Sequence, residues 1–402
     1  MKNNRLKVLH ICTSDIGGAG LCCLRIHRSL IKEGVDSKVL MLRTSHINDE
    51  GVFVYKKGQF KDWLWRLCNK LIRLCGLEIT DYNKSINLTK KTKIFTTIPV
   101  SIFDITNISL VKDADIIHLH WIDNFIDYPT FFSKVNKPIV WTQHDEGLFS
   151  GIFHFVDGKK YVNNLEDKYY RIKFDAVHSA KNIGIVLLSK SMYDRFRADP
   201  MINGRIITVI NNPVDCSSFH PINKAEARAI MGIPAEALVF SFAAGKIADP
   251  WKGLSSLSRA LQEMNIRNTW IMAIGGTEGY ESLPLVHTTG PLNGAESMSI
   301  AYSCADYFVM PSKKEAFAQT PIESMACGVP AIVFPVSGTE ELINDINGVR
   351  ANGFTIADLK EAISTAIKHN YDSNIIRQDM LNRFSPAHIA NEYMSFYNEI
   401  SK

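Results

Sequence analysis

The sequence predicts an α/β protein with two doubly wound, Rossmann-like domains. Short apolar runs rich in β-branched residues alternate with segments whose apolar residues recur at helical spacing. Several of the runs end in glycine or in polar residues, and the alternation begins again near residue 238. Strands that alternate with helices favour a parallel sheet covered by helices on both faces.

The first half opens with a strand at 7–11, a glycine turn at 17–20 and a helix that ends before Gly34. The next predicted strands lie at 37–42, 115–121, 138–142, 184–188 and 205–210. We expect residues 1–208 to form the first domain, with a C-terminal helix at about 386–402 packed back on it.

The second half repeats this order and is expected to form a domain over residues 209–385. Its predicted strands lie at 238–243, 269–274, 306–310 and 329–334, and its clearest helices at 255–264 and 320–327. Ligands of such sheets bind beyond the carboxyl ends of the strands. Two sheets that face each other would therefore enclose a cleft.

Composition excludes several classes of protein. The 402 residues are 46% hydrophobic and 21% charged, which argues against disorder, and the net charge of +4 is small for a nucleic-acid-binding protein. No apolar run reaches the 18 residues of a membrane span, and no signal peptide is evident. The eight cysteines form no C-x-x-C pair. We expect a cytoplasmic protein with reduced thiols and no nucleic-acid partner.

The basic charge is concentrated in residues 56–93. This segment holds ten Lys or Arg against three acidic residues, a net +7. A predicted amphipathic helix within it carries Trp63 and Trp65, together with the basic residues Lys61, Arg66, Lys70 and Arg73. Such a helix suits an anionic membrane surface, which would make the protein peripheral at the inner face of the cell membrane. A helix docked on its own domain, with solvated lysines, explains the pattern equally well.

Two glutamates near a helix start are the sharpest chemical feature. Glu315 follows two lysines in a loop, where a carboxylate needs hydrogen-bond donors, and Glu323 comes eight residues later. Residues 320–323 read as a capping box with proline at the first helical position, so Glu323 could simply cap the helix. At the other end of the chain, the turn with Gly17 and Gly18 favours an anion but lacks the spacing of a dinucleotide site.

The stretch from Glu315 to Glu323 resembles the Glu–seven residues–Glu motif of retaining glycosyltransferases with the GT-B fold, family four. Four other segments also resemble parts of this family and occur in the same order along the chain as in the family. They are the link at 212–221, the Lys252-Gly253 turn, the N-terminal unit at 4–43 and the segment 141–151. The last of these is similar to a variant found in bacterial polysaccharide biosynthesis.

The resemblance implies a role for each matching residue. His144 and Glu315 would contact the reacting sugar as catalytic residues, and Glu323 would hold the ribose. Lys252 and, less closely matched, Lys246 would neutralise the diphosphate. The remaining donor-binding positions are Gly17, Gly18, Phe317, Ala318, Gln319 and Thr320. The family needs no metal or other cofactor besides its donor substrate, a nucleotide diphosphate sugar such as a UDP- or GDP-sugar.

One pair of aspartates and one pair of histidines are expected to be structural. Asp113-x-Asp115 precedes a predicted strand instead of ending one, unlike a metal-binding D-x-D of the other glycosyltransferase fold. His118-x-His120 has the spacing to chelate a metal, but we expect a hydrogen-bonded structural pair.

We therefore expect a retaining hexosyltransferase that moves a sugar from a nucleotide diphosphate sugar to a saccharide or lipid-linked saccharide in cell-surface polysaccharide biosynthesis. Two alternatives remain open. One is a nucleotide-sugar epimerase of the same architecture, and the other is a non-catalytic sugar-binding subunit of a polysaccharide assembly complex.

Overall fold

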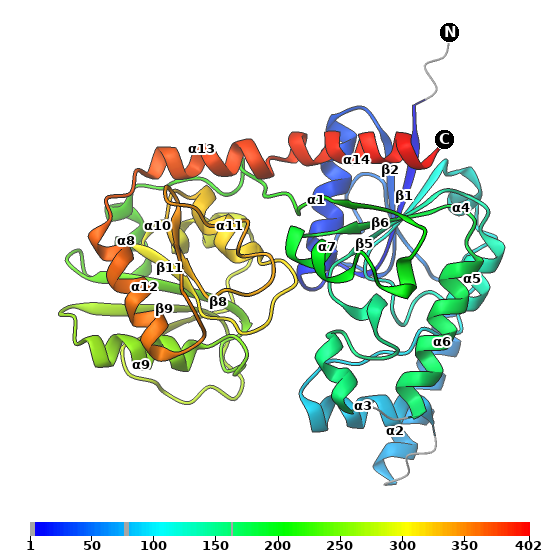
Figure 1. Cartoon of the computed structure of the whole chain (residues 1–402), viewed down its shortest axis with the longest axis horizontal. Helices are drawn as coiled ribbons and strands as arrows, with labels where there is room; N and C mark the ends of the chain where they lie inside the picture. The colour runs from blue at the N-terminus through cyan, green and yellow to red at the C-terminus, as the bar shows by residue number, and fades with distance from the viewer. Residues whose placement is uncertain (1–4, 76–79, 162–163) are drawn as a thin grey trace. The chain divides into compact units, whose positions relative to one another are not determined.

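The computed structural model describes residues 5–75, 80–161 and 164–402. Residues 76–79 of the basic segment and the first residue of the unit 4–43 thus lie outside the described residues. The chain forms two compact units (Figure 1). The first comprises Met1–Leu188, Met192–Ile210 and Ala390–Lys402, and the second comprises Ser189–Ser191 and Asn211–Ile389.

The first unit contains a seven-stranded parallel sheet in the order β3-β2-β1-β4-β5-β6-β7. Its strands are β1 Lys7–Ser14, β2 Asp36–Arg43, β3 Val52–Val54, β4 Ile116–Leu119, β5 Ile139–Gln143, β6 Ile183–Leu187 and β7 Ile206–Val209. Strand order reverses at β1, which pairs with both β2 and β4. This is the point at which doubly wound sheets bind ligands.

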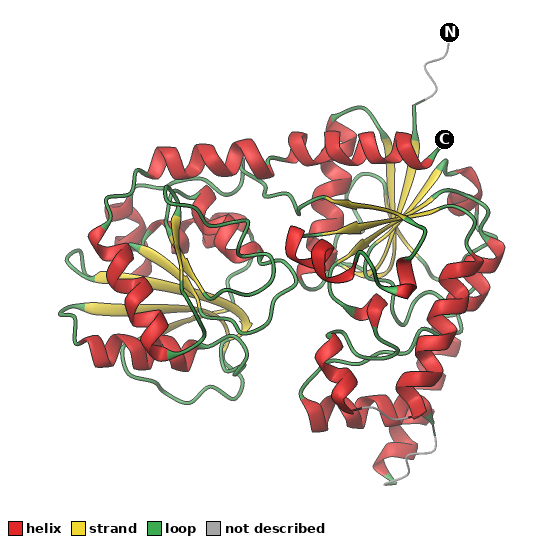
Figure 2. Ribbon diagram, viewed as in Figure 1, coloured by secondary structure: helices red, strands yellow, loops and turns green. Residues whose placement is uncertain are grey.

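Figure 2 shows the helices of the first unit in red. They are α1 Gly18–Lys32, α2 Gln59–Leu74, α3 Asp81–Thr92, α4 Ser109–Asp113, α5 Tyr128–Lys134, α6 Asn164–Ser179 and α7 Lys190–Phe196. The last helix of the chain, α14 Pro386–Ile400, brings Tyr393 and Tyr397 into the first unit, where their hydroxyls hydrogen-bond Thr142 and His118.

The second unit contains a six-stranded parallel sheet in the order β10-β9-β8-β11-β12-β13. Its strands are β8 Leu238–Lys246, β9 Thr269–Gly276, β10 Val286–Gly290, β11 Tyr307–Met310, β12 Ala331–Val333 and β13 Gly348–Arg350. Its helices are α8 Lys224–Met231, α9 Leu254–Met264, α10 Ala295–Ser303, α11 Gln319–Ala326, α12 Ile356–Lys368 and α13 Ser373–Phe384.

Apolar periodicity decides which faces of these elements are buried. Phe240 and Phe242 alternate along β8 and pack in one cluster with Leu257 of α9 and Leu359 of α12, all fully buried. α11 lies against β11 and β12. The predicted fold of two Rossmann-like sheets is therefore confirmed. No helix within the described ranges is long and apolar enough to cross a bilayer.

Candidate functional site

An ion pair joins the two most distinctive charged residues of the second unit. Lys252 Nζ lies 2.6 Å from Glu315 Oε1, with side chains 31% and 15% exposed. Lys252 precedes α9, and Glu315 lies in the loop that follows β11. Both therefore lie beyond the carboxyl ends of strands, where this kind of sheet binds ligands. The pair combines a cation that attracts phosphate with an acceptor for sugar hydroxyls.

The backbone around this pair is held tightly. A Cβ on Gly253, whose φ is +83°, would lie 2.2 Å from the Pro311 carbonyl oxygen, so only glycine allows the turn to approach the loop. The Lys313 N–H donates to the Trp251 carbonyl over 2.8 Å, and Lys314 Nζ lies 4.6 Å from the centroid of the Trp251 ring. The turn and the loop are thus fixed to each other.

The structure corrects the capping interpretation of Glu323. α11 begins at Gln319, two residues earlier than the capping box requires, so Thr320 is already helical and caps nothing. Ala318 is the N-cap and no side chain caps it. Glu323 lies in the second turn, is 8% exposed and accepts a hydrogen bond from the Tyr302 hydroxyl over 3.3 Å.

The start of α11 is therefore available for an anion. Phe317 and Ala318 are buried, and Gln319 and Thr320 are half-buried. Helix N-termini attract negative charge through their unpaired N–H groups. The Ser312 hydroxyl, in the same loop, is buried and makes no hydrogen bond to any described residue.

Lys246 is placed differently from Lys252. Its side chain is 68% exposed, and its ammonium lies 3.4 Å from Glu278, which is also exposed. Both residues lie near the ends of neighbouring strands, β8 and β9. The structure brings Lys252 to Glu315 but leaves Lys246 in a surface pair of little energetic value.

The glycine turn of the first unit connects β1 to α1. Gly17 is the N-cap with a φ of 85°, and Gly18 is the first helical residue. A Cβ on Gly20 would lie 2.1 Å from the Ser14 carbonyl oxygen, so this glycine permits the helix to start close to the strand. No side chain caps α1, which leaves its N-terminus suited to an anion.

His144 follows directly after β5 and is half-buried. Burial lowers its pKa from 6.5 to about 4, so its imidazole is neutral at neutral pH. Its Nε2 lies 3.0 Å from Nδ1 of His120. The carboxylate of the adjacent Asp145 binds another histidine.

That histidine is His154, which lies between two carboxylates. Its Nδ1 donates to Asp145 over 2.6 Å, and its Nε2 lies 3.4 Å from Asp123 Oδ2. Burial alone lowers the pKa of His154, but Asp145 and Asp123 outweigh it and raise the pKa above the ordinary value. The buried Lys173 donates to the carbonyls of Gly147 and Ser150 close by, over 2.7 and 3.0 Å. Sequence reasoning missed this cluster, because its members lie far apart in the chain.

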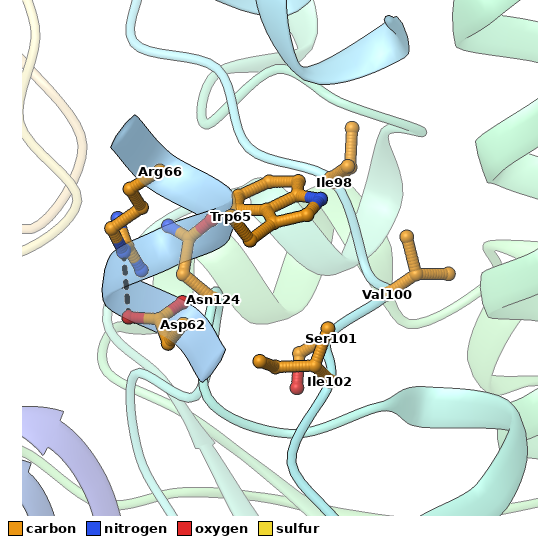
Figure 3. A pocket seen from close by; sticks show the side chains of 8 residues that line it. All are labelled: Asp62, Trp65, Arg66, Ile98, Val100, Ser101, Ile102 and Asn124. Atoms are coloured by element: carbon orange, nitrogen blue, oxygen red, sulfur yellow. Dashed lines mark hydrogen bonds and ion pairs between the residues drawn. The ribbon is translucent and has the colours of Figure 1, made fainter. Parts of the chain in front are cut away.

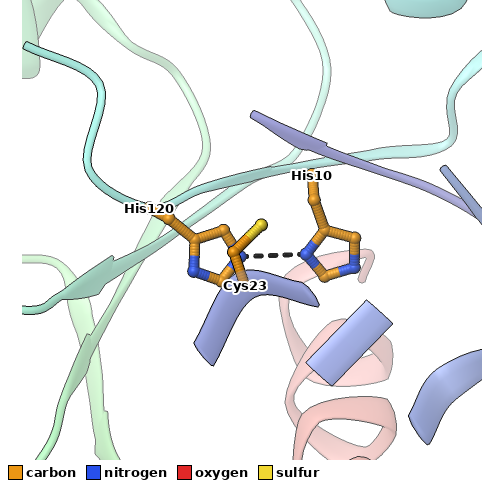
Figure 4. A group of neighbouring side chains, drawn as sticks. All are labelled: His10, Cys23 and His120. Carbon is orange, nitrogen blue, oxygen red and sulfur yellow. Dashed lines mark hydrogen bonds between the residues drawn. The ribbon is translucent and has the colours of Figure 1, made fainter. Parts of the chain in front are cut away.

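Of the two pairs expected to be structural, Asp115 and both histidines have protein partners. Asp115 accepts a hydrogen bond from the Lys7 N–H over 2.9 Å. His118 bonds the hydroxyls of Tyr397 and Thr142 through its two ring nitrogens, and His120 bonds His10 and His144. A ligand set that could hold a metal is formed by His10, Cys23 and His120, all buried in the first unit (Figure 4).

Helix α2 exposes an apolar stripe. Phe60, Trp63, Leu64, Leu71 and Leu74 are between 46% and 73% exposed. The opposite side holds the buried Asp62 and Asn69, and Asp62 pairs with Arg66 over 2.7 Å. A cavity of about 170 Å³ lies beneath this side, lined by Trp65, Ile98, Val100 and their neighbours (Figure 3). The helix is thus anchored through polar groups, and its apolar stripe faces away.

Comparison with known proteins places the ion pair inside a recognised domain. Residues 240–372 match the family "Glycosyl transferases group 1". A D-inositol 3-phosphate glycosyltransferase from Actinosynnema mirum is 28% identical over 179 residues, which cover 39% of this chain and 42% of the relative. The chain thus matches less than half the length of that relative.

Solved structures share the whole architecture. Sucrose-phosphate synthase from Thermosynechococcus elongatus has a TM-score of 0.67 at 16% identity, and the alignment covers 98% of this chain and 99% of that one. HepE of Anabaena, solved with UDP-glucose, has a TM-score of 0.68 at 16% identity and coverages of 98% and 100%. At this identity the likeness establishes the fold, which is GT-B.

Proposed function

We propose that this protein is a glycosyltransferase that moves a sugar from a nucleotide diphosphate sugar to a saccharide or lipid-linked saccharide acceptor, with retention of anomeric configuration. The Lys252–Glu315 ion pair carries the proposal. Both residues lie within the matched segment, and Glu315 follows strand β11, close in sequence to the uncapped start of α11. The glutamate motif supports the assignment to family four.

The chemistry needs charge stabilisation more than a nucleophile. When the bond between the anomeric carbon and the diphosphate breaks, negative charge develops on the leaving oxygen. Lys252 and the N–H groups at the start of α11 are suited to stabilise it, without a metal or a further cofactor. The acceptor hydroxyl then bonds the anomeric carbon from the same face, and its proton passes to the departing phosphate.

We assign residues to the sugar, the diphosphate and the ribose of the donor. Glu315 accepts hydrogen bonds from sugar hydroxyls, and Lys252 moves from Glu315 toward the diphosphate when the donor binds. Glu323 accepts hydrogen bonds from the ribose hydroxyls through one carboxylate oxygen, while the Tyr302 hydroxyl donates to the other.

The other candidate residues have weaker support. His144 contacts the reacting sugar. Lys246 remains a weaker candidate for the diphosphate because of its exposure. Gly17 and Gly18 supply backbone N–H groups. UDP-glucose, the ligand named for HepE, is the first donor to test.

A membrane-associated acceptor is supported by α2. An exposed apolar stripe beside lysines is what a helix needs to lie in the interface of an anionic bilayer. This arrangement favours the membrane interpretation over a helix that buries its apolar face on its own unit. A lipid-linked saccharide, and with it a role in cell-surface polysaccharide synthesis, would then be presented at that surface.

One assay separates this proposal from its alternatives. The protein is incubated with a panel of UDP-, GDP- and ADP-sugars, with and without membrane extract as acceptor, and the products are analysed. A transferase releases nucleoside diphosphate, an epimerase converts the donor without releasing nucleotide, and a sugar-binding subunit leaves the donor unchanged. Nucleotide release that stops in Glu315→Ala supports the proposal, whereas epimer formation or an unchanged donor overturns it.

A further inference from the structure

Three histidines of the first unit form a continuous row that runs from the carboxyl end of β5 to the middle of β1. His10 lies in the middle of β1, His120 follows β4, and His144 follows β5. His10 Nδ1 lies 2.9 Å from His120 Nε2, and His120 Nδ1 lies 3.0 Å from His144 Nε2. Neighbouring rings are stacked, at interplanar angles of 25° and 28°. Each link therefore joins the Nδ1 of one ring to the Nε2 of the next.

This head-to-tail order permits only two proton arrangements. His10 and His120 are buried and His144 is half-buried, which disfavours the charged imidazolium, so each ring carries one N–H. Both hydrogen bonds can form only if every ring is protonated at Nδ1 or every ring is protonated at Nε2. Any mixed arrangement places two lone pairs or two protons against each other.

The inner end of the row distinguishes the two arrangements. His10 is fully buried, and its Nε2 has no hydrogen-bond partner among the described residues. Protonation at Nε2 would leave a buried N–H donor without an acceptor, which is rare in folded proteins. Protonation at Nδ1 leaves only an unpaired acceptor at Nε2 and lets Nδ1 donate to His120, on the side where Cys23 lies (Figure 4). The row is therefore protonated at Nδ1 throughout.

The outer end of the row is His144. Its Nε2 accepts from His120, and its Nδ1 makes no hydrogen bond to any residue in the described part of the chain. We propose that His120 and His10 are positioning residues that hold His144 in its Nδ1–H tautomer, so that His144 offers a hydrogen-bond donor and not a base to an oxygen of its ligand. The inference rests on the proposed function only for the identity of that ligand, a hydroxyl or ring oxygen of the donor sugar.

A metal ion bound by His10, Cys23 and His120 is the competing explanation for the same cluster. Two imidazole nitrogens bound to tetrahedral zinc lie about 3.3 Å apart, given Zn–N bonds of about 2.0–2.1 Å. The observed 2.9 Å between His10 and His120 is a hydrogen-bond distance. The geometry therefore favours the proton arrangement over coordination.

The test is to determine histidine tautomers by nitrogen-15 NMR of the full chain labelled at its imidazoles, with single-histidine variants for assignment. We expect His144 to be protonated at Nδ1 in the wild type. His120→Leu removes the donor and should shift His144 toward the Nε2–H form, whereas His120→Asn keeps an N–H donor and should preserve Nδ1–H. His118→Gln is the matched control, because His118 is buried in the same cluster but lies outside the row.

Kinetics give a second measurement. His120→Leu should raise KM for the donor roughly five- to tenfold, as expected for one misdirected hydrogen bond, and His120→Asn should restore it. An Nε2–H form of His144 in the wild type overturns the proposal. Stoichiometric zinc that disappears in Cys23→Ser also overturns it. If the tautomer is as expected but no nucleotide sugar is turned over, the proposed function fails and the row stands.

Discussion

The histidines of the first unit should make it sensitive to mild acid, and His144 allows the size of the effect to be worked out. An unfolded histidine titrates near 6.5, whereas burial holds the folded pKa of His144 at about 4. The stability that depends on a neutral His144 is present above pH 6.5 and is lost as the pH falls toward 4, because only the unfolded chain gains the proton. A pKa of about 4 instead of 6.5 corresponds to about 3 kcal/mol.

The measurement is hydrogen exchange of β1, β4 and β5 as a function of pH, which reports opening of this sheet without contribution from the second unit. Between pH 7 and pH 4, His144→Gln should lose about 3 kcal/mol less of its opening free energy than the wild type. His178→Gln, which removes an exposed imidazole from α6 of the same unit, is the control and should follow the wild type. Parallel losses in the wild type and His144→Gln would refute the reasoning.

Three further predictions concern the donor site and α2. Glu323→Ala should weaken nucleoside diphosphate binding by about 1–3 kcal/mol in calorimetry. Tyr302→Phe removes one hydrogen bond and should cost less than half of that binding free energy. Equal affinity of the wild type and Glu323→Ala would leave Glu323 a purely structural residue. Lys252→Met should raise the donor Kd at least tenfold, because the unpaired Glu315 carboxylate then repels the diphosphate. Lys246→Met should change the donor Kd less than threefold. The reverse order of effects would exchange the roles of the two lysines. A quadruple variant with glutamine in place of Lys61, Arg66, Lys70 and Arg73 should bind anionic vesicles more weakly and with a smaller salt dependence. Donor hydrolysis should persist in this variant. Unchanged vesicle binding would mean that α2 serves only to stabilise the fold.

Sequence periodicity predicted most of the fold because the central strands of both sheets are buried runs of apolar residues. The strands it missed are β3, β10 and β13. All three end their sheets and pair with one neighbouring strand only, so local sequence carries little signal for them. The capping box put the N-cap of α11 at Thr320, two residues after the observed N-cap Ala318, because the pattern Thr-Pro-x-Glu fits a capping box whether or not the helix begins there.

The candidate site was predictable in part. The Lys252 turn and the Glu315 loop carry recognisable motifs, but their ion pair depends on how close Gly253 comes to Pro311, which no linear pattern encodes. The partners of His144 were hidden for the same reason, since His10 and His120 are 110 residues apart in the chain. The exposure of the α2 stripe also required the structure, because an amphipathic pattern does not say which face is covered.

The proposed donor site of the second unit comprises the Lys252 turn, the Glu315 loop and the start of α11. Nucleotide binding there can be measured by hydrogen exchange with saturating UDP, GDP or ADP, and with the corresponding sugar nucleotides. We expect one nucleotide series to slow exchange in peptides covering 250–254 and 315–323. We also expect Glu315→Ala to retain protection by the nucleotide but to lose the additional protection by the sugar. Protection confined to other parts of the chain, or no protection by any of the three series, would contradict the proposed site.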